Sequence, residues 1–140
     1  MAVNFLFSEI RITLSERERL KLFIEAVFKR NKKKLRSLTY IFCSDPFLLE
    51  INKQFLKHDD YTDIITFNLS YPAKDIEGEV YISTDRVREN AQNLAIPLKE
   101  ELHRVIFHGA LHLCGYSDKT KNEKQRMRSA EDKCLELYFS

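Results

Sequence analysis

The segment VIFHGALHLC at residues 105–114 is the feature that most restricts what this chain can fold into. Apart from His108 and His112, every side chain in it is apolar or, at Gly109, absent. An α-helix turns about 100° per residue, so the segment predicts a buried helix with both imidazoles on one strip. A buried imidazole without a partner costs roughly 1–3 kcal/mol, so the fold must satisfy each ring.

Two kinds of partner can satisfy these rings. Hydrogen bonds to backbone groups or carboxylates are the usual solution for a single buried histidine, whereas a His pair at i and i+4 is a standard metal-binding arrangement. The residues after the helix favour the metal. Gly115 suits a left-handed C-cap that reverses the chain, and Asp118 then completes the pattern H-x3-H-x2-G-x2-D. An aspartate in a loop is also a common turn residue, and this alternative stays open.

Gly109 directly follows the first histidine of the pair. Zinc peptidases with a similar helix carry glutamate at this position, where it acts as the general base. Glycine cannot accept a proton, so a peptidase mechanism of that kind would need its base from elsewhere. Zinc accepts carboxylate oxygen as well as imidazole nitrogen, and three protein ligands would leave a fourth position for water, as in catalytic sites.

The remaining sequence predicts interleaved strands and helices. Strands are expected at residues 3–12, 37–43, 62–69 and 78–83. Helices are expected after a capping box formed by Ser15 and Glu18, after a cap at Ser44 or Asp45, from about Ser83 to Leu94, and at 97–114 and 121–137. We therefore expect an α+β fold with α/β-like layers: a small mixed four-stranded sheet with about five helices, in one domain over residues 1–140, with the metal site at the end of helix 97–114.

The charge pattern allows a polyanionic partner without requiring one. The net charge is only +2, but basic residues crowd the segments 29–36 and 119–128. Such clusters can bind phosphates, or they can simply be solvated helix ends. The sequence has no apolar run long enough for a membrane helix and no secretory signal, so a cytoplasmic protein without a membrane partner is expected.

The segment HGALHLCGY at residues 108–116 resembles the HGxLHLxGYDH signature of the YbeY family. Residues 51–67 and the strand GEVYIS at 78–83 resemble two further family blocks in the right order. The family consists of bacterial ribosomal RNA maturation factors, described as metal-dependent endoribonucleases. The resemblance implies a zinc-dependent endoribonuclease of ribosome biogenesis, with rRNA and the small ribosomal subunit as partners. It also implies one Zn²⁺ per chain, or another divalent metal, held by His108, His112 and Asp118.

The chain departs from the family pattern at two places. Asp118 takes the position of the closing histidine ligand; an alternative alignment puts Lys119 there, but a cationic lysine cannot bind zinc. Leu56 stands where the family carries an arginine linked to the substrate. Lys53 and Lys57 are the candidates to bind substrate phosphate in its place, and Lys57 is also the candidate catalytic residue beside a metal-bound water.

Two other functions remain open from the sequence. The chain could be a non-catalytic, zinc-containing RNA-binding factor of ribosome assembly, which would bind RNA without cutting it. It could also be a general metallohydrolase, which would turn over small esters or amides without affinity for rRNA fragments.

Overall fold

The computed structural model describes residues 2–56, 61–72 and 74–140. Four strands form one sheet in the order β1-β2-β4-β3: β1 (Val3–Phe7), β2 (Leu35–Cys43), β4 (Ile76–Ser83) and β3 (Ile64–Asn68). β2 lies parallel to both β1 and β4, and β3 runs antiparallel to β4. The expected small mixed sheet of an α+β fold is thus confirmed.

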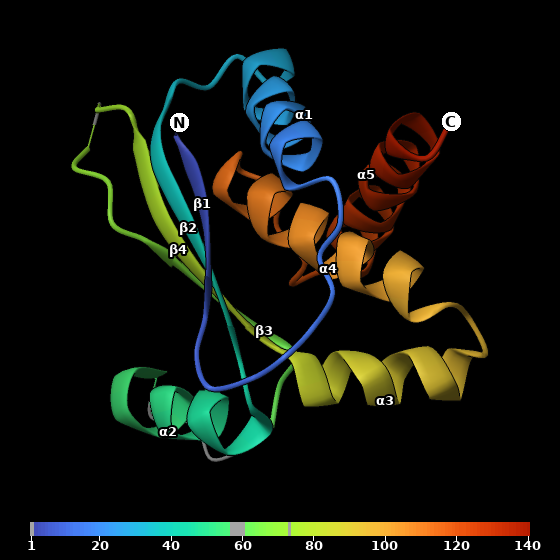
Figure 1. Ribbon diagram of the computed structural model, residues 1–140. Helices are drawn as coiled ribbons and strands as arrows, with labels where there is room; N and C mark the ends of the chain where they lie inside the picture. The colour runs from blue at the N-terminus through green and yellow to red at the C-terminus, as the bar shows by residue number, and fades with distance from the viewer. Residues whose placement is uncertain (1, 57–60, 73) are drawn as a thin grey trace.

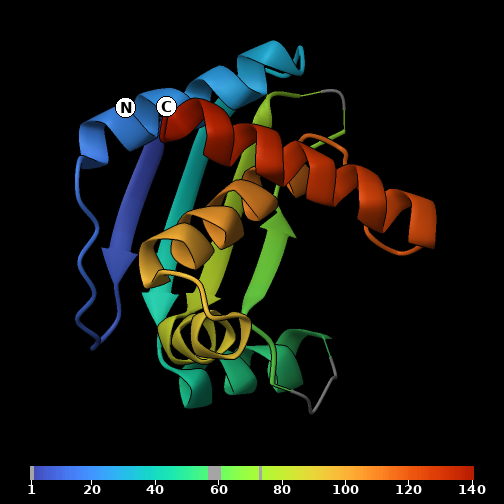
Figure 2. The same ribbon diagram turned by 90° about the vertical axis from the view of Figure 1, so that its right-hand side faces the viewer.

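Five helices surround this sheet within the described residues (Figure 1). They are α1 (Arg17–Arg30), α2 (Asp45–Leu56), α3 (Thr84–Leu94), α4 (Leu98–Leu113) and α5 (Lys121–Tyr138). α1 and α4 cover one face of the sheet, and α5 packs outside α4, as the turned view also shows (Figure 2). None of the described helices is both long and apolar enough to span a membrane.

The core forms between the sheet and α4. Alternate residues of β2 point into it, with Leu38, Tyr40 and Phe42 fully buried. Ten of the sixteen residues of α4 are buried, which explains the mostly apolar sequence of its second half. The Tyr40 hydroxyl donates a 2.8 Å hydrogen bond to the carbonyl of Ile106, so the largest buried polar side chain of the sheet is satisfied by the central helix.

Gly109 lets α4 approach β4 closely. A Cβ atom at this position would lie 2.9 Å from Cγ1 of Val80 and 3.3 Å from Cδ1 of Ile64. The position therefore faces the sheet, whereas His108 and His112 lie on another strip of the helix. Consequently no side chain at position 109 could act as a base at the histidine pair, whatever its identity.

Two expected boundaries are wrong. The first strand ends at Phe7 rather than at residue 12, because its partner β2 ends at Cys43 and the last bond joins Ser8 N–H to the Phe42 carbonyl. The capping box at Ser15 does not form, since Glu16 takes the N-cap position in a left-handed conformation (φ 53°) without a side-chain cap. The cap of α3 is as expected: Ser83 accepts a bond from Arg86 N–H.

Candidate functional site

His108 and His112 lie one turn apart on α4, as their spacing predicts. Their ring centroids are 6.3 Å apart and their ring planes differ by only 6°. The His108 side chain is 23% exposed, whereas His112 is exposed to solvent. The pair thus forms a polar strip that runs from a half-buried ring to the surface.

The turn after α4 brings Asp118 back to this strip. Gly115 has φ 108°, its N–H donates to the His112 carbonyl, and the N–H of Tyr116 donates to the Leu111 carbonyl. This pair of bonds is the Schellman motif that a glycine C-cap predicts. As a result, Oδ2 of Asp118 lies 3.5 Å from Nε2 of His108.

These donors fit a metal ion in their chemistry, and one pair also fits in its spacing. Two ligands of a tetrahedral zinc ion, each about 2.05 Å from it, lie about 3.3 Å apart, close to the separation of His108 Nε2 and Asp118 Oδ2. Among the residues that the structure describes, however, no three His, Cys, Asp or Glu side chains converge tightly enough to hold a metal as they stand. His112 would therefore have to rotate, which exposed side chains do readily.

The sequence reasoning missed Glu131, which holds His108 from behind. Nδ1 of His108 donates a 2.6 Å hydrogen bond to Oε2 of this buried carboxylate. Oε1 of Glu131 accepts a 3.1 Å bond from Arg104. With Nδ1 engaged by Glu131, Nε2 is the ring nitrogen that faces Asp118. A carboxylate behind a histidine in this way orients the ring, and Nε2 can bind a metal once it is unprotonated.

A signal for Glu131 is present in the sequence. Met127, Glu131, Cys134 and Tyr138 follow at helical spacing and form the buried stripe of α5. A carboxylate on an otherwise apolar stripe needs a buried partner, because an unpaired buried charge is strongly unfavourable. The sequence alone could not show that this partner is a histidine on α4.

Beside His108 lies a cavity of about 200 Å³ that α4, α5 and the start of β3 enclose. Three carboxylates line it, from Asp63, Glu101 and Glu131, together with the guanidinium groups of Arg104 and Arg128. Asn90 donates a 3.2 Å bond to Asp63, but Oε1 of Glu101 is buried without a hydrogen-bond partner in the described structure. The cavity is thus a strongly polar pocket directly beside the histidine strip.

Burial dominates the protonation equilibria of this cavity. It raises the pKa of Asp63 against the opposing effects of His108 and of a backbone hydrogen bond. It also raises the pKa of Glu101, to which Asp63 adds while Arg104 and Arg128 oppose. For His108, burial alone would lower the pKa, but the hydrogen bond and charge of Glu131, with help from Asp118, bring it above its ordinary value.

The variant Glu101→Gln tests this account of the buried carboxyl. Because the folded-state pKa of Glu101 is raised, its contribution to stability is fully present below the unfolded pKa and is lost as pH rises through the folded pKa. As pH increases from below about 4.3 toward neutrality, the melting temperature of E101Q should therefore rise relative to that of the wild type. Each kcal/mol of difference in unfolding free energy corresponds to about 3 °C in melting temperature. Circular dichroism melts over this pH series provide the measurement.

Glu100→Gln, one residue earlier and less buried, is the matched control. Parallel pH curves for E101Q and the wild type would contradict the role assigned to burial at Glu101.

Lys53 and Lys57 were the sequence candidates for binding substrate phosphate, and the described one, Lys53, does not line this cavity. Lys53 lies on the exposed side of α2, in its last turn, and is absent from the residues that line the cavity at His108. Lys57 lies outside the described residues. Leu56, at the position of the family arginine, is 41% exposed.

Comparisons with known proteins agree with the fold. The family model described as "Endoribonuclease YbeY" matches residues 7–138. A curated Endoribonuclease YbeY from Cytophaga hutchinsonii is 48% identical over 135 residues, covering 96% of this chain and 94% of that protein. The Flavobacterium psychrophilum protein of the same name is 44% identical over 130 residues, covering 93% and 92%. The solution structure of TM1509 from Thermotoga maritima matches with a TM-score of 0.64 at 26% identity, covering 98% of this chain and 89% of that one.

Proposed function

The chain belongs to the YbeY family of endoribonucleases, and from this premise we propose that it is a zinc-dependent enzyme that matures ribosomal RNA in the cytoplasm. We propose that residues 1–140 act as one domain and that the RNA it cuts belongs to the small ribosomal subunit. His108, His112 and Asp118 are the proposed ligands of one Zn²⁺. The observation that carries this assignment is the pairing of His108 Nε2 with Asp118 Oδ2 at 3.5 Å, while Glu131 occupies Nδ1.

A divalent metal, when bound, polarises a phosphoryl oxygen and lowers the pKa of a bound water toward about 7. The chain's own residues prepare the place for this chemistry. Glu131 fixes the tautomer and orientation of His108, and Arg104 holds Glu131 in turn. Asp118 supplies a negative charge at the mouth of the strip. This charge attracts a cation more strongly than a neutral histidine at position 118 would.

The basic clusters are proposed to hold the RNA backbone. Within the segments 29–36 and 119–128, the exposed side chains include Lys32, Lys33, Lys119 and Lys121. Lysine contacts with phosphate are sequence-independent and sensitive to salt, so binding should weaken as ionic strength rises. The role of Lys57 as a catalytic or phosphate-binding residue remains a prediction.

The variant Asp118→Asn tests the proposed ligand set. It keeps the shape of the side chain but removes the charge and weakens its ability to bind a metal. We expect bound zinc, measured by elemental analysis, to fall well below one ion per chain, and cleavage of an rRNA fragment to fall at least about 100-fold.

The matched control is Asp132→Asn, since this exposed carboxylate on α5 binds Arg104 at 2.7 Å without facing the histidine strip. D132N should retain both zinc and cleavage. If D118N keeps its zinc, Asp118 is only a turn residue. If the wild type binds rRNA and never cuts it, the chain is an assembly factor instead.

A further inference from the structure

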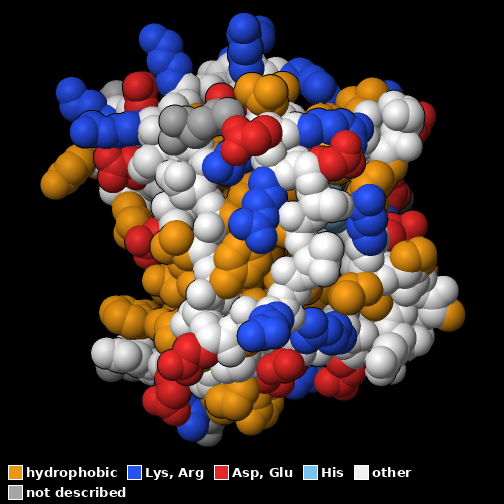
Figure 3. Space-filling model, viewed as in Figure 1, with side chains coloured by type: hydrophobic (Ala, Val, Ile, Leu, Met, Phe, Trp, Pro, Cys, Tyr) orange, Lys and Arg blue, Asp and Glu red, His pale blue; other side chains and the backbone are white. Residues whose placement is uncertain are grey.

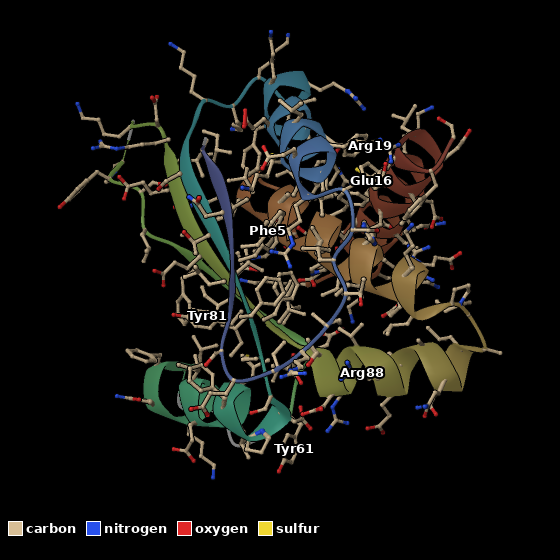
Figure 4. The ribbon with its side chains drawn as sticks, in the orientation of Figure 1. Phe5, Glu16, Arg19, Tyr61, Tyr81 and Arg88 are labelled. Atoms are coloured by element: carbon tan, nitrogen blue, oxygen red, sulfur yellow. The ribbon has the colours of Figure 1, made fainter. Side chains whose placement is uncertain are left out.

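A second and larger hollow lies on a different face of α4 from the histidine strip. Its volume is about 670 Å³, within the range of pockets that bind small ligands. The segment 7–17 between β1 and α1 forms one wall, α3 contributes Arg88, and the first turns of α4 form the rest. Figure 4 shows Arg88 on α3, beneath the segment that leads from β1 to α1.

Every charged group that lines this hollow at neutral pH is a cation. Arg11, Arg17, Arg88 and Lys99 line it, and no Asp or Glu does so among the described residues. Acidic residues occur in the adjoining sequence, but none of them is among the lining residues. The hollow therefore carries a positive potential that favours an anionic occupant.

The wall of the hollow is held in place by two of these arginines. Arg88 donates a 3.1 Å bond to the Arg11 carbonyl, which ties α3 to the segment 7–17. Arg17 donates from Nε to the Leu14 carbonyl, and its guanidinium carbon lies 4.7 Å above the centre of the Phe7 ring. The hollow is thus largely formed before anything binds, which reduces the entropy cost of binding.

The floor of the hollow is apolar. Phe7, Ile10, Ile12 and Leu98 line it and are partly buried against the main core. Figure 3 shows apolar surface at the centre of this face, with Lys and Arg side chains beside it. An occupant should therefore carry a flat or apolar part for the floor and a negative charge for the rim.

We propose that this hollow binds an unpaired nucleotide of the RNA substrate, with its base against the apolar floor and its phosphates at the cationic rim. An unpaired base stacks on apolar and aromatic side chains, and arginine is the preferred partner of phosphate. The proposal rests on the proposed function in one respect, namely that the substrate is RNA. It adds a contact remote from the reacting bond, which anchors the RNA without taking part in cleavage.

The test is the affinity of a short fluorescein-labelled single-stranded RNA for a double variant, Arg11→Glu with Lys99→Glu. Both side chains are exposed, and neither belongs to the proposed metal site. Fluorescence anisotropy with EDTA present excludes cleavage. We expect affinity to fall about tenfold or more, and the slope of log K against log salt to decrease by about 1.4 for two lost phosphate contacts.

Lys74→Glu with Lys133→Glu is the matched control, because it changes the net charge equally at exposed positions outside the hollow. This control should lose less than about threefold in affinity. Equal losses in the two double variants, or none in the first, would overturn the proposal. Melting temperatures of both variants confirm that each is folded.

Photo-crosslinking with 4-thiouridine RNA gives a second readout. Crosslinks in residues 7–17 or 98–103 support the hollow, whereas crosslinks confined to residues 104–131 overturn it. Free AMP that binds the hollow while RNA does not would show a mononucleotide site and also overturn it. Binding is measured without metal, so this test does not depend on cleavage. A chain that never cuts RNA can still bind it in the hollow, and a chain that cuts RNA can still lack this contact, so the two proposals fail separately.

Discussion

The variant His108→Ala is expected to lose its bound metal and to cut RNA at least about 1,000-fold more slowly than the wild type. His108 is the one proposed ligand that touches both carboxylates of the site, Asp118 at 3.5 Å and Glu131 at 2.6 Å. The several kcal/mol of charge stabilisation that a metal supplies correspond to about three powers of ten in rate. Elemental analysis and single-turnover cleavage of an rRNA fragment provide the measurements.

His103→Ala on the same helix is the matched control. His103 is buried, donates from Nδ1 to the Lys99 carbonyl and stacks on Tyr138, with 5.4 Å between the ring centroids. Its loss should lower the melting temperature but leave the metal in place. Full metal content in H108A would show that its imidazole is only a structural partner of Glu131.

The variant Gly109→Glu is expected to prevent folding rather than to create a peptidase. A glutamate would push into Val80, which is fully buried and whose Cγ1 already lies 2.9 Å from the added Cβ. Overpacking costs about 1–3 kcal/mol, and a buried unpaired carboxylate costs several more. The sum approaches the roughly 5–15 kcal/mol of stability that a whole domain possesses.

Gly109→Ala provides the graded comparison, because it adds the methyl group without the charge. It should remain folded and bind its metal. Its free energy of unfolding, measured with urea, should fall by about 1–3 kcal/mol. A soluble G109E with the wild-type melting temperature would mean that position 109 does not face the sheet.

The elements that the sequence predicted best are those whose pattern is local. The apolar run around His108 predicted α4, and Gly115 predicted the turn that returns Asp118, because both signals lie within a few residues of what they determine. The first strand was predicted too long, since its end depends on where its partner β2 ends, which is information from a distant segment. Ser15 failed as a cap for a similar reason: burial of Leu14 and the left-handed Glu16 delay the start of α1.

The site shows the same limit. The histidine spacing reveals a polar strip on one helix. The carboxylate that orients His108, however, comes from Glu131 on another helix, 23 residues further along the chain. The cavity acids likewise come from separate segments, Asp63 from the residue before β3 and Glu101 from α4, which meet only in the folded chain. A family resemblance transfers ligand positions, whereas these supporting contacts require the packed structure.

The dependence of His108 on Glu131 sets an order of events during protein synthesis. α5 is the last of the described elements to leave the ribosome, so both histidines emerge well before the carboxylate that prepares one of them. A nascent chain that lacks α5 also lacks the carboxylate that fixes the tautomer of His108. Among the described elements, the carboxylate that orients His108 is therefore the last part of the site to be synthesised.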